Sequence, residues 1–366
     1  SKQLSFVSIT GPRNISDTYE LTSGKQRKIS YEATEAVLLF ENGNGHKMNL
    51  VVRIFNDGLA FRYHFPGDTD TLLTITGELS AFNLPDTGKV WIHPYDTVTK
   101  WTPAYETYYK NGIPVGTPAS KSMSGWAFPA TFDIENGWVL ITEALLDGTY
   151  PASHLESQCE NGMYRLRFPE PSESLSKFNH LPHSTLPWST PWRVAIIGKQ
   201  PGTLMESNMI THLAEPARFE DTGWIKPGRA AWSWWSDSPS PLYVKAQNRY
   251  TDLAVTMGWE YNLVDANWDQ MKDGTVQDAI KYAIDMGIGP LLWYNSGGPN
   301  NTVDEAPRDR MWNPVIRKKE FALLEEWGVR GVKVDFFQSD KQKVIQQYLG
   351  ILEDAAAHRI LVNFHG

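Results

Sequence analysis

The sequence predicts two parts of different class: an N-terminal β sandwich over residues 1–223 and an incomplete (β/α)8 barrel over residues 224–366. Two patterns lead to this prediction. Short β-rich runs separated by turn signals fill the first part, where helical periodicity is almost absent. Beyond residue 224, apolar strands alternate with amphipathic helices at intervals of about 30 to 40 residues, a pattern typical of parallel βα units.

Many short strands at close spacing favour a large antiparallel sandwich for the first part. The runs that predict its strands cover residues 36–40, 46–55, 60–65, 90–93, 137–142, 163–168 and 192–197. Asn56, Asp57 and Gly58 are typical of a hairpin turn between two of them. Pro, Ser and His crowd residues 169–191, which we therefore expect to form a long loop late in the domain.

Five apolar strands and four helices are expected in the second part. The strands are predicted at residues 230–235, 260–264, 289–294, 329–337 and 359–364, and the helices at 244–257, 276–286, 313–327 and 341–358. A complete eight-stranded barrel takes about 250 residues. We therefore expect only its first five strands here, and expect the natural protein to continue well past Gly366.

Composition disfavours some classes of function but does not identify the function. The 366 residues carry a net charge of −8, which disfavours a nucleic-acid partner because phosphate binding needs a basic face. No stretch approaches the roughly 18 apolar residues of a membrane span. A single cysteine, Cys159, can form no internal disulfide. Fifteen tryptophans suit both a Trp-rich core and stacking on sugar rings.

Polar and aromatic residues gather where each predicted strand of the second part ends. In strand order they are Trp232, Trp234, Trp235 and Asp237; Asp265, Asn267, Trp268 and Asp269; Trp293, Tyr294 and Asn295; Lys333, Asp335, Gln338 and Asp340; Asn363 and His365. In parallel barrels the active site is built at these carboxyl ends. Core packing would place apolar residues there, so the pattern indicates an enzyme.

Four motifs carry a resemblance to a known family. They cover residues 53–63 (RIFNDGLAFRY), 190–193 (TPWR), 331–337 (GVKVDFF) and 361–366 (LVNFHG), and together they resemble glycoside hydrolase family 97. The resemblance implies a β super-sandwich, a central (β/α)8 barrel and a C-terminal β domain. It also implies an exported protein, periplasmic or secreted, that acts on oligosaccharides.

The resemblance further implies a branch of that family. Retaining members carry an aspartate nucleophile at the position of Asp335, whereas inverting members carry a general-base glutamate where this chain has Gly366. Retention and an α-galactoside substrate are therefore expected. Calcium is expected as cofactor, with Glu106 as the ligand from the β domain. The remaining calcium glutamates and the acid/base glutamate are expected beyond this sequence.

The residues around Asp335 suit a nucleophile. Retaining glycosidases need two carboxyl groups about 5 to 5.5 Å apart, one of which attacks the anomeric carbon. Strand alternation places Lys333 on the same face as Asp335, where an ammonium group would keep the carboxylate ionised. The alternative for Asp335 is a helix cap at the end of its strand.

Seven residues are candidates for binding the substrate: Asp265, Lys333, Trp232, Trp268, Trp293, Asn295 and His365. Asp265 could accept two sugar hydroxyls, or could instead cap a helix. About half of the strand-end tryptophans must face helices, because successive strand residues point to opposite faces. Three alternatives stay open: an α-glucosidase, a β-L-arabinopyranosidase, and a carbohydrate-binding relative without catalysis. The sequence does not indicate an oligomeric state.

Overall fold

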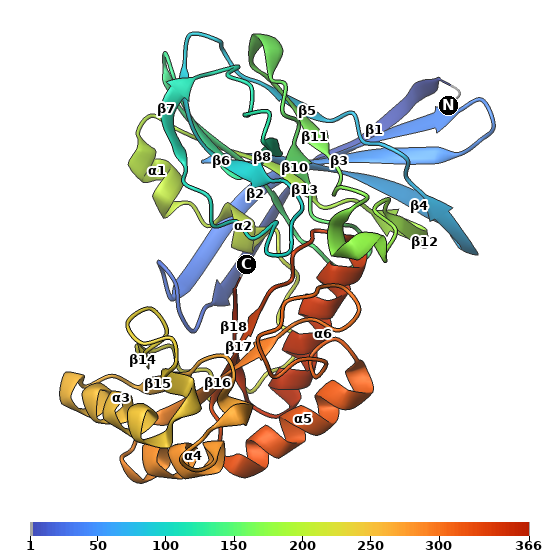
Figure 1. The fold of residues 1–366 in the computed structure, drawn as a ribbon. Coiled ribbons are helices and arrows are strands. Elements are labelled where there is room, and N and C mark those ends of the chain that lie inside the picture. The colour runs from blue at the N-terminus through green and yellow to red at the C-terminus, as the bar shows by residue number, and fades with distance from the viewer. Residues whose placement is uncertain (1–2, 366) are drawn as a thin grey trace.

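Antiparallel and parallel strands occupy separate parts of the computed structural model, which describes residues 3–365 (Figure 1). The antiparallel part has thirteen strands: β1 (Leu4–Glu20), β2 (Lys28–Asn42), β3 (Lys47–Phe55), β4 (Gly58–Thr74), β5 (Ala81–Asn83), β6 (Lys89–Asp96), β7 (Lys110–Pro114), β8 (Met123–Ile134), β9 (Gly137–Ala144), β10 (His154–Leu155), β11 (Met163–Arg167), β12 (His183–Ser189) and β13 (Trp192–Gly198). Two short helices follow, α1 (Pro201–Glu206) and α2 (Met209–His212).

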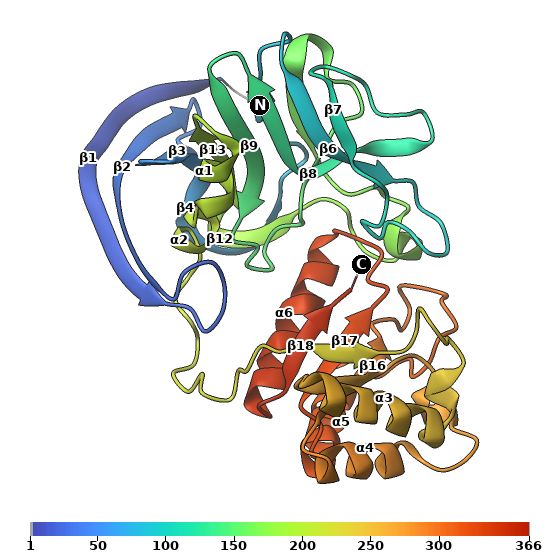
Figure 2. The same ribbon diagram turned by 90° about the vertical axis from the view of Figure 1, so that its left-hand side faces the viewer.

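The thirteen strands form one hydrogen-bonded network that bends over into a sandwich (Figure 2). The main path runs β1-β2-β3-β4-β13-β9-β8-β10-β11-β5, with β12 paired to β4 and β6 paired to β7 and β8. Alternate residues of the strands enter two buried clusters. One contains Ile92, Phe132 and Ile141, and the other is built around Trp192 and Val194. Burial of these side chains is the main stabilising term for the β domain.

Six strands lie outside the runs that predict strands: β1, β5, β7, β8, β10 and β12. β1 is exposed along most of its length, so its residues lack the alternation that marks a half-buried strand. β12 lies within residues 169–191, which were expected to be a loop. It forms because it pairs with β4, where Trp188 faces Phe65, and this tertiary pairing outweighs the local turn signals. Asn56 and Asp57 form the turn of the β3–β4 hairpin, as predicted.

Gly162 closes the turn before β11 in a conformation that only glycine adopts without strain. Its φ is +71°, and a Cβ atom there would lie 1.9 Å from the carbonyl oxygen of Leu84. We expect Gly162→Ala to lower the free energy of unfolding by roughly 2 to 4 kcal/mol, through strain and displaced backbone. Gly45→Ala is the matched control, because Gly45 also has a positive φ of +81° but nothing lies within 4 Å. Equal urea midpoints for the two variants would contradict the steric argument.

The second part contains a parallel sheet with the order β14-β15-β16-β17-β18. Its strands are β14 (Ala230–Trp232), β15 (Tyr261–Val264), β16 (Gly289–Asn295), β17 (Gly331–Asp335) and β18 (Leu361–Phe364). Its helices are α3 (Val244–Met257), α4 (Val276–Asp285), α5 (Pro314–Trp327) and α6 (Gln342–Ala357). All nine elements were predicted, and their bounds agree within three residues. The result is a multidomain β plus α/β protein.

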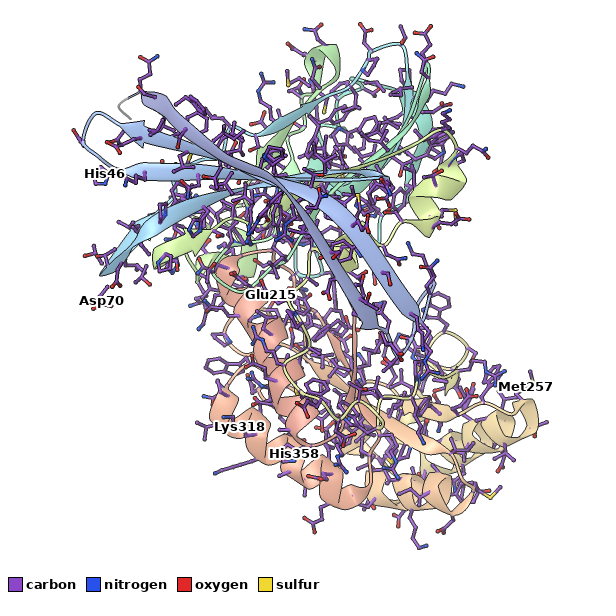
Figure 3. The ribbon with its side chains drawn as sticks, turned by 180° about the vertical axis from the view of Figure 1, so that it is seen from behind. His46, Asp70, Glu215, Met257, Lys318 and His358 are labelled. Atoms are coloured by element: carbon purple, nitrogen blue, oxygen red, sulfur yellow. The ribbon has the colours of Figure 1, made fainter. Side chains whose placement is uncertain are left out.

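The two faces of the parallel sheet differ in chemistry. Val332 and Val334 of β17 belong to the apolar cluster that the helices cover, together with Leu292 of β16. Alternation along β17 sends Lys333 and Asp335 to the other face. Figure 3 shows Lys318 and Met257 on the outer side of the helices, away from the sheet. No helix in residues 3–365 is long and apolar enough to cross a membrane.

The connection between β17 and α6, residues 336–341, is fastened to the β domain. Glu173 of the β domain accepts hydrogen bonds from the hydroxyl of Ser339, at 2.9 Å, and from the backbone N–H of Asp340, at 3.0 Å. The Asp340 carboxylate in turn accepts a hydrogen bond from the Tyr105 hydroxyl. Burial and the neighbouring Glu173 carboxylate raise the pKa of Asp340. The loop that follows Asp335 is therefore held from outside its own domain.

Candidate active site

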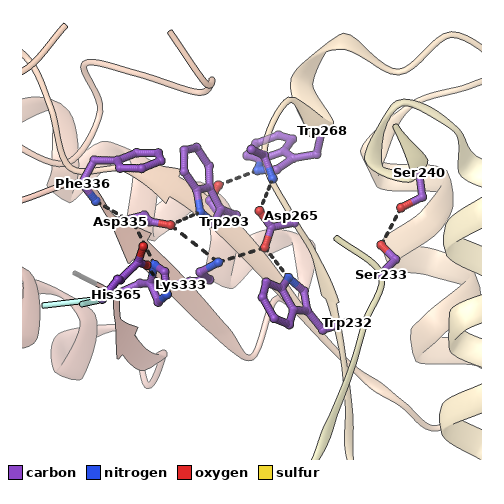
Figure 4. A network of polar contacts seen from close by, with 12 residues as sticks. Trp232, Ser233, Ser240, Asp265, Trp268, Trp293, Lys333, Asp335, Phe336 and His365 are labelled. Carbon is purple, nitrogen blue, oxygen red and sulfur yellow. Dashed lines mark hydrogen bonds and ion pairs between the residues drawn. The ribbon is translucent and has the colours of Figure 1, made fainter. Parts of the chain in front are cut away.

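One lysine joins two buried carboxylates at the carboxyl ends of β15 and β17 (Figure 4). The ammonium nitrogen of Lys333 lies 3.1 Å from Oδ2 of Asp265 and 3.6 Å from Oδ2 of Asp335. The exposed fractions are 6% for Lys333, 2% for Asp265 and 4% for Asp335. Charges this well buried are costly unless they are paired, and one cation serves both anions here.

Asp335 is held by donors on both carboxylate oxygens. The indole Nε1 of Trp293 donates to Oδ2 at 3.0 Å, while Nδ1 of His365 lies 3.0 Å from Oδ1. The backbone N–H of Phe336 also donates to Oδ1, at 2.8 Å. Burial alone would raise the pKa of Asp335, but the His365 hydrogen bond and the His365 and Lys333 charges outweigh it, so the pKa is lowered. The carboxylate is therefore oriented and ionised.

Backbone strain occurs at the residue next to Asp335. Phe336 has a φ of +65°, a conformation unfavourable for a bulky side chain. Its carbonyl oxygen accepts hydrogen bonds from Oγ of Ser296 at 2.9 Å and from Nδ2 of Asn301 at 2.8 Å. Strain that is held in place by surrounding contacts is typical of functional sites. Here it turns the chain sharply after β17 and leaves Asp335 at the end of the strand.

His365 ties the pH response of the site to Asp335. Its hydrogen bond to Asp335 raises the His365 pKa above 6.5 and lowers that of Asp335 below 3.8. The stabilising effect of the pair through His365 is present below pH 6.5 and is lost as pH rises through the raised pKa. The effect through Asp335 is present above pH 3.8 and is lost as pH falls through the lowered pKa.

We expect His365→Ala to move the acidic limb of the kcat/KM profile to higher pH, because Asp335 loses its main stabilising donor. The measurement is a pH–rate profile of the full-length enzyme. His46→Ala is the control, because His46 lies in an exposed turn at the tip of the β2–β3 hairpin (Figure 3). Superimposed acidic limbs for wild type and His365→Ala would exclude this coupling.

Asp265 and Trp232 form the second half of the site. The Trp232 indole donates a hydrogen bond to Oδ2 of Asp265, and the Lys333 ammonium lies 4.7 Å from the centre of the Trp232 ring. The other oxygen of Asp265 accepts from the backbone N–H of Ala266 at 2.8 Å. The arrangement gives an aromatic face beside an oriented carboxylate, which are the two groups that bind the faces and hydroxyls of a sugar ring.

Trp268 and Asn295 have structural partners instead of facing this cluster. The Trp268 indole donates to the backbone oxygen of Trp293 at 2.7 Å, and its ring packs into the helix-covered core against Tyr294. Asn295 is fully buried, and its amide holds the loop that follows β16 through the carbonyl oxygens of Val303 and Glu305. The structure therefore brings together Asp335, Lys333, Asp265, Trp232, Trp293 and His365.

Glu106 reaches the site from the β domain, with Oε1 3.3 Å from Nε2 of His365. Within residues 3–365, no three His, Cys, Asp or Glu side chains are grouped so that they could hold a metal ion. Calcium prefers six to eight oxygen ligands, so Glu106 could supply only one of them. The residues described here do not by themselves make a calcium site. Gly366, the position at which the resemblance separates inverting from retaining members, lies outside the described residues.

Sequence reasoning named Glu106 of the β-domain segment 97–109 but missed the contacts that Lys100 and Trp101 of the same segment make with Gln338 and Phe336. The ring centre of Trp101 lies 5.7 Å from that of Phe336. The backbone oxygen of Lys100 accepts a hydrogen bond from the side-chain amide of Gln338 at 2.6 Å. More than 230 positions separate these partners in the chain, and no periodic pattern links them. The aromatic residues around Glu106 were the one available signal.

A pair of buried carboxylates with an adjoining indole, at the carboxyl ends of a parallel sheet, suits the chemistry of a glycoside hydrolase, which cleaves with paired carboxyl groups. The family described as glycosyl-hydrolase 97 N-terminal matches residues 2–216, and that described as glycoside hydrolase 97 matches residues 224–366. The chain belongs to glycoside hydrolase family 97.

Named relatives agree with this assignment. The chain is 31% identical to a probable retaining alpha-galactosidase of Streptomyces bingchenggensis, over 97% of this chain and 52% of that protein. It is 24% identical to the retaining alpha-galactosidase of Bacteroides thetaiotaomicron, over 87% of this chain and 50% of that protein. The chain thus spans about half the length of these relatives.

Solved structures resemble the whole described fold. A beta-arabinopyranosidase superposes with a TM-score of 0.92 and 32% identity, covering 99% of this chain and 58% of that one. A family 97 enzyme of Pseudoalteromonas sp. strain K8 in complex with acarbose gives a TM-score of 0.80 at 20% identity, covering 99% of this chain and 58% of that one. At 20% identity, the similarity to the Pseudoalteromonas enzyme shows a shared fold only.

Proposed function

We propose that this chain is the β domain and the first five strands of the (β/α)8 barrel of a retaining exo-α-glycosidase that cleaves terminal α-galactosides. The observation that carries the proposal is the ionised, buried Asp335, paired with Lys333 at the carboxyl end of β17. The names of the two relatives support retention and α-galactoside specificity. The family resemblance supports export to the periplasm or out of the cell.

The proposed chemistry uses Asp335 as nucleophile. Its carboxylate oxygen attacks the anomeric carbon and forms a glycosyl ester while the bond to the leaving oxygen breaks. A second carboxyl group, proposed to lie on a later strand, protonates the leaving oxygen and then deprotonates the water that hydrolyses the ester. Trp293 and His365 hold Asp335 in position for attack. Asp265 and Trp232 would bind the hydroxyls and ring face of the terminal sugar.

Retention is tested by following the hydrolysis of an aryl α-galactoside by NMR, using the full-length enzyme. The α anomer of the free sugar should appear before mutarotation mixes the anomers. First appearance of the β anomer would show inversion. In that event Asp335 would be a base or a binding group, and the proposal would fail.

A β-L-arabinopyranoside is a second candidate substrate, because the chain is similar to a beta-arabinopyranosidase. The structure superposes on that of a beta-arabinopyranosidase at 32% identity. A β-L-arabinopyranoside matches an α-galactoside without the hydroxymethyl arm, so both place the same ring atoms on Asp335, Asp265 and Lys333. Specificity then depends on whether the site stabilises the hydroxymethyl group. The ratio of kcat/KM for the two aryl glycosides decides between them.

We also propose that Glu106 supplies one oxygen ligand to calcium in the complete enzyme. We expect incubation with a chelator to abolish hydrolysis by the full-length protein, and calcium to restore it. Glu106→Gln should raise the calcium concentration needed for half-maximal activity. Its control is Glu135→Gln, at the exposed turn between β8 and β9. Full activity in excess chelator would remove calcium from the proposal.

A further inference from the structure

An exposed tryptophan of the β domain packs against the residue that follows Asp335. Trp101 is 45% exposed, and its ring centre lies 5.7 Å from that of Phe336, the residue that follows Asp335. Phe336 in turn lies 5.8 Å, edge to face, from Trp293, which donates to Asp335. A continuous row of aromatic rings therefore leads from the buried carboxylate to solvent.

The position of Trp101 is built by contacts between the two parts of the chain. Gln338, after β17, donates to the backbone oxygen of Lys100 at 2.6 Å. The Lys100 ammonium pairs with Asp304 at 2.8 Å and lies 4.9 Å from the centre of the Trp101 ring. Asp304 belongs to the loop after β16, and its side chain is 88% exposed. An indole, an ammonium group and a carboxylate are thus presented together to solvent.

This combination matches the surface of a sugar. Pyranose rings expose apolar C–H faces that stack on indoles, and their hydroxyls pair with charged donors and acceptors. Asp335, Asp265 and Lys333 are at most 6% exposed, so a terminal sugar that contacts them would itself be largely enclosed. The remainder of the substrate must then extend outward, toward the exposed end of the aromatic row.

We propose that Trp101, with Lys100 and Asp304, binds the leaving-group side of the substrate, which is the sugar joined to the terminal residue through the scissile bond. The ligand class is a neutral oligosaccharide carrying at least one pyranose beyond the cleaved linkage. The inference rests on the proposed function, because it assigns the leaving-group side of that reaction. It makes the β domain a determinant of substrate preference.

The test compares two substrates of the full-length enzyme, an α-galactosyl disaccharide and α-galactosyl fluoride. The fluoride carries no sugar in the leaving group and so does not reach Trp101. Trp101→Ala should lower kcat/KM for the disaccharide about tenfold, the loss expected for one stacking contact. It should leave kcat/KM for the fluoride unchanged. Trp101→Phe should restore most of the disaccharide activity, because a smaller ring still stacks.

Tyr108→Ala is the matched control, since Tyr108 is 91% exposed on the same segment. It should leave both substrates unaffected. Equal losses on both substrates in Trp101→Ala would overturn the subsite and make Trp101 a packing residue. A similar loss on the disaccharide in Tyr108→Ala would also overturn it. A wild-type enzyme that does not hydrolyse the fluoride would instead overturn the proposed function, so the two failures are distinguishable.

Discussion

Asp335→Gly is expected to lower kcat for an aryl α-galactoside by roughly 10⁴-fold or more, the loss typical when an enzyme is deprived of its nucleophile. The reason lies in the contacts of the carboxylate, which is ionised and oriented by Trp293, His365 and Lys333. Asp265 is not free to replace it, because Asp265 is already bonded to Lys333 and Trp232. Steady-state kinetics of the full-length enzyme measure the effect.

Added azide sharpens this experiment, because glycine leaves room for a small anion where the carboxylate was. With retention established, a β-glycosyl azide product would identify Asp335 as the group on the β face of the sugar. An α-glycosyl azide would assign it instead as the acid/base residue. Asp269→Asn is the control, since Asp269 is an exposed aspartate that also follows β15. It should retain nearly full activity.

Arg193→Met is expected to produce the largest loss of stability, about 3 to 5 kcal/mol, because it leaves two buried carboxylates without their cation. The Arg193 side chain has no exposed surface and bonds Glu78 through Nε and Nη2 and Glu143 through Nη1. The Glu78 and Glu143 side chains are 3% and 9% exposed. Calorimetry of the full-length protein should show the β-domain transition at a much lower temperature.

Two further variants separate charge from packing at this position. Arg13→Met removes an arginine whose side chain is 70% exposed, so it should cost about 1 kcal/mol or less. Adding Glu78→Gln and Glu143→Gln to Arg193→Met should recover part of the loss, because the uncompensated charges disappear. A triple variant no more stable than Arg193→Met would show that the loss arises from packing alone.

The parallel sheet was predictable because each of its strands and helices carries a strong local pattern. β17 reads as alternating apolar and charged residues, and α3 follows a helical period and ends at a glycine, Gly258. β1 was not predictable because its residues are exposed and lack the alternation of a half-buried strand. β12 was not predictable because it forms through pairing with β4, which no local pattern indicates. Tertiary contacts, not local propensity, decide such strands.

The candidate site was predictable in its strand ends but not in the directions of its side chains. Alternation along β17 places Lys333 beside Asp335, and the structure agrees. Trp268 and Asn295 follow strands in the same way, yet one packs into the helix-covered core and the other holds a loop. Trp268 lies beyond β15, where strand alternation no longer applies, and Asn295 ends β16 but is held by the loop that follows, so strand position alone does not give the partners of either side chain.

The attachment of residues 336–341 to the β domain constrains how such proteins can change by recombination. A glycosidase whose β domain were a detachable module could exchange it between relatives without loss. In this chain Glu173 and Tyr105 are matched to the segment directly after Asp335. A foreign β domain would leave that segment without its anchors and would disturb the strand end that carries the carboxylate. We therefore expect the two parts to be inherited together, and a substitution on one side of the contact to require a compensating substitution on the other.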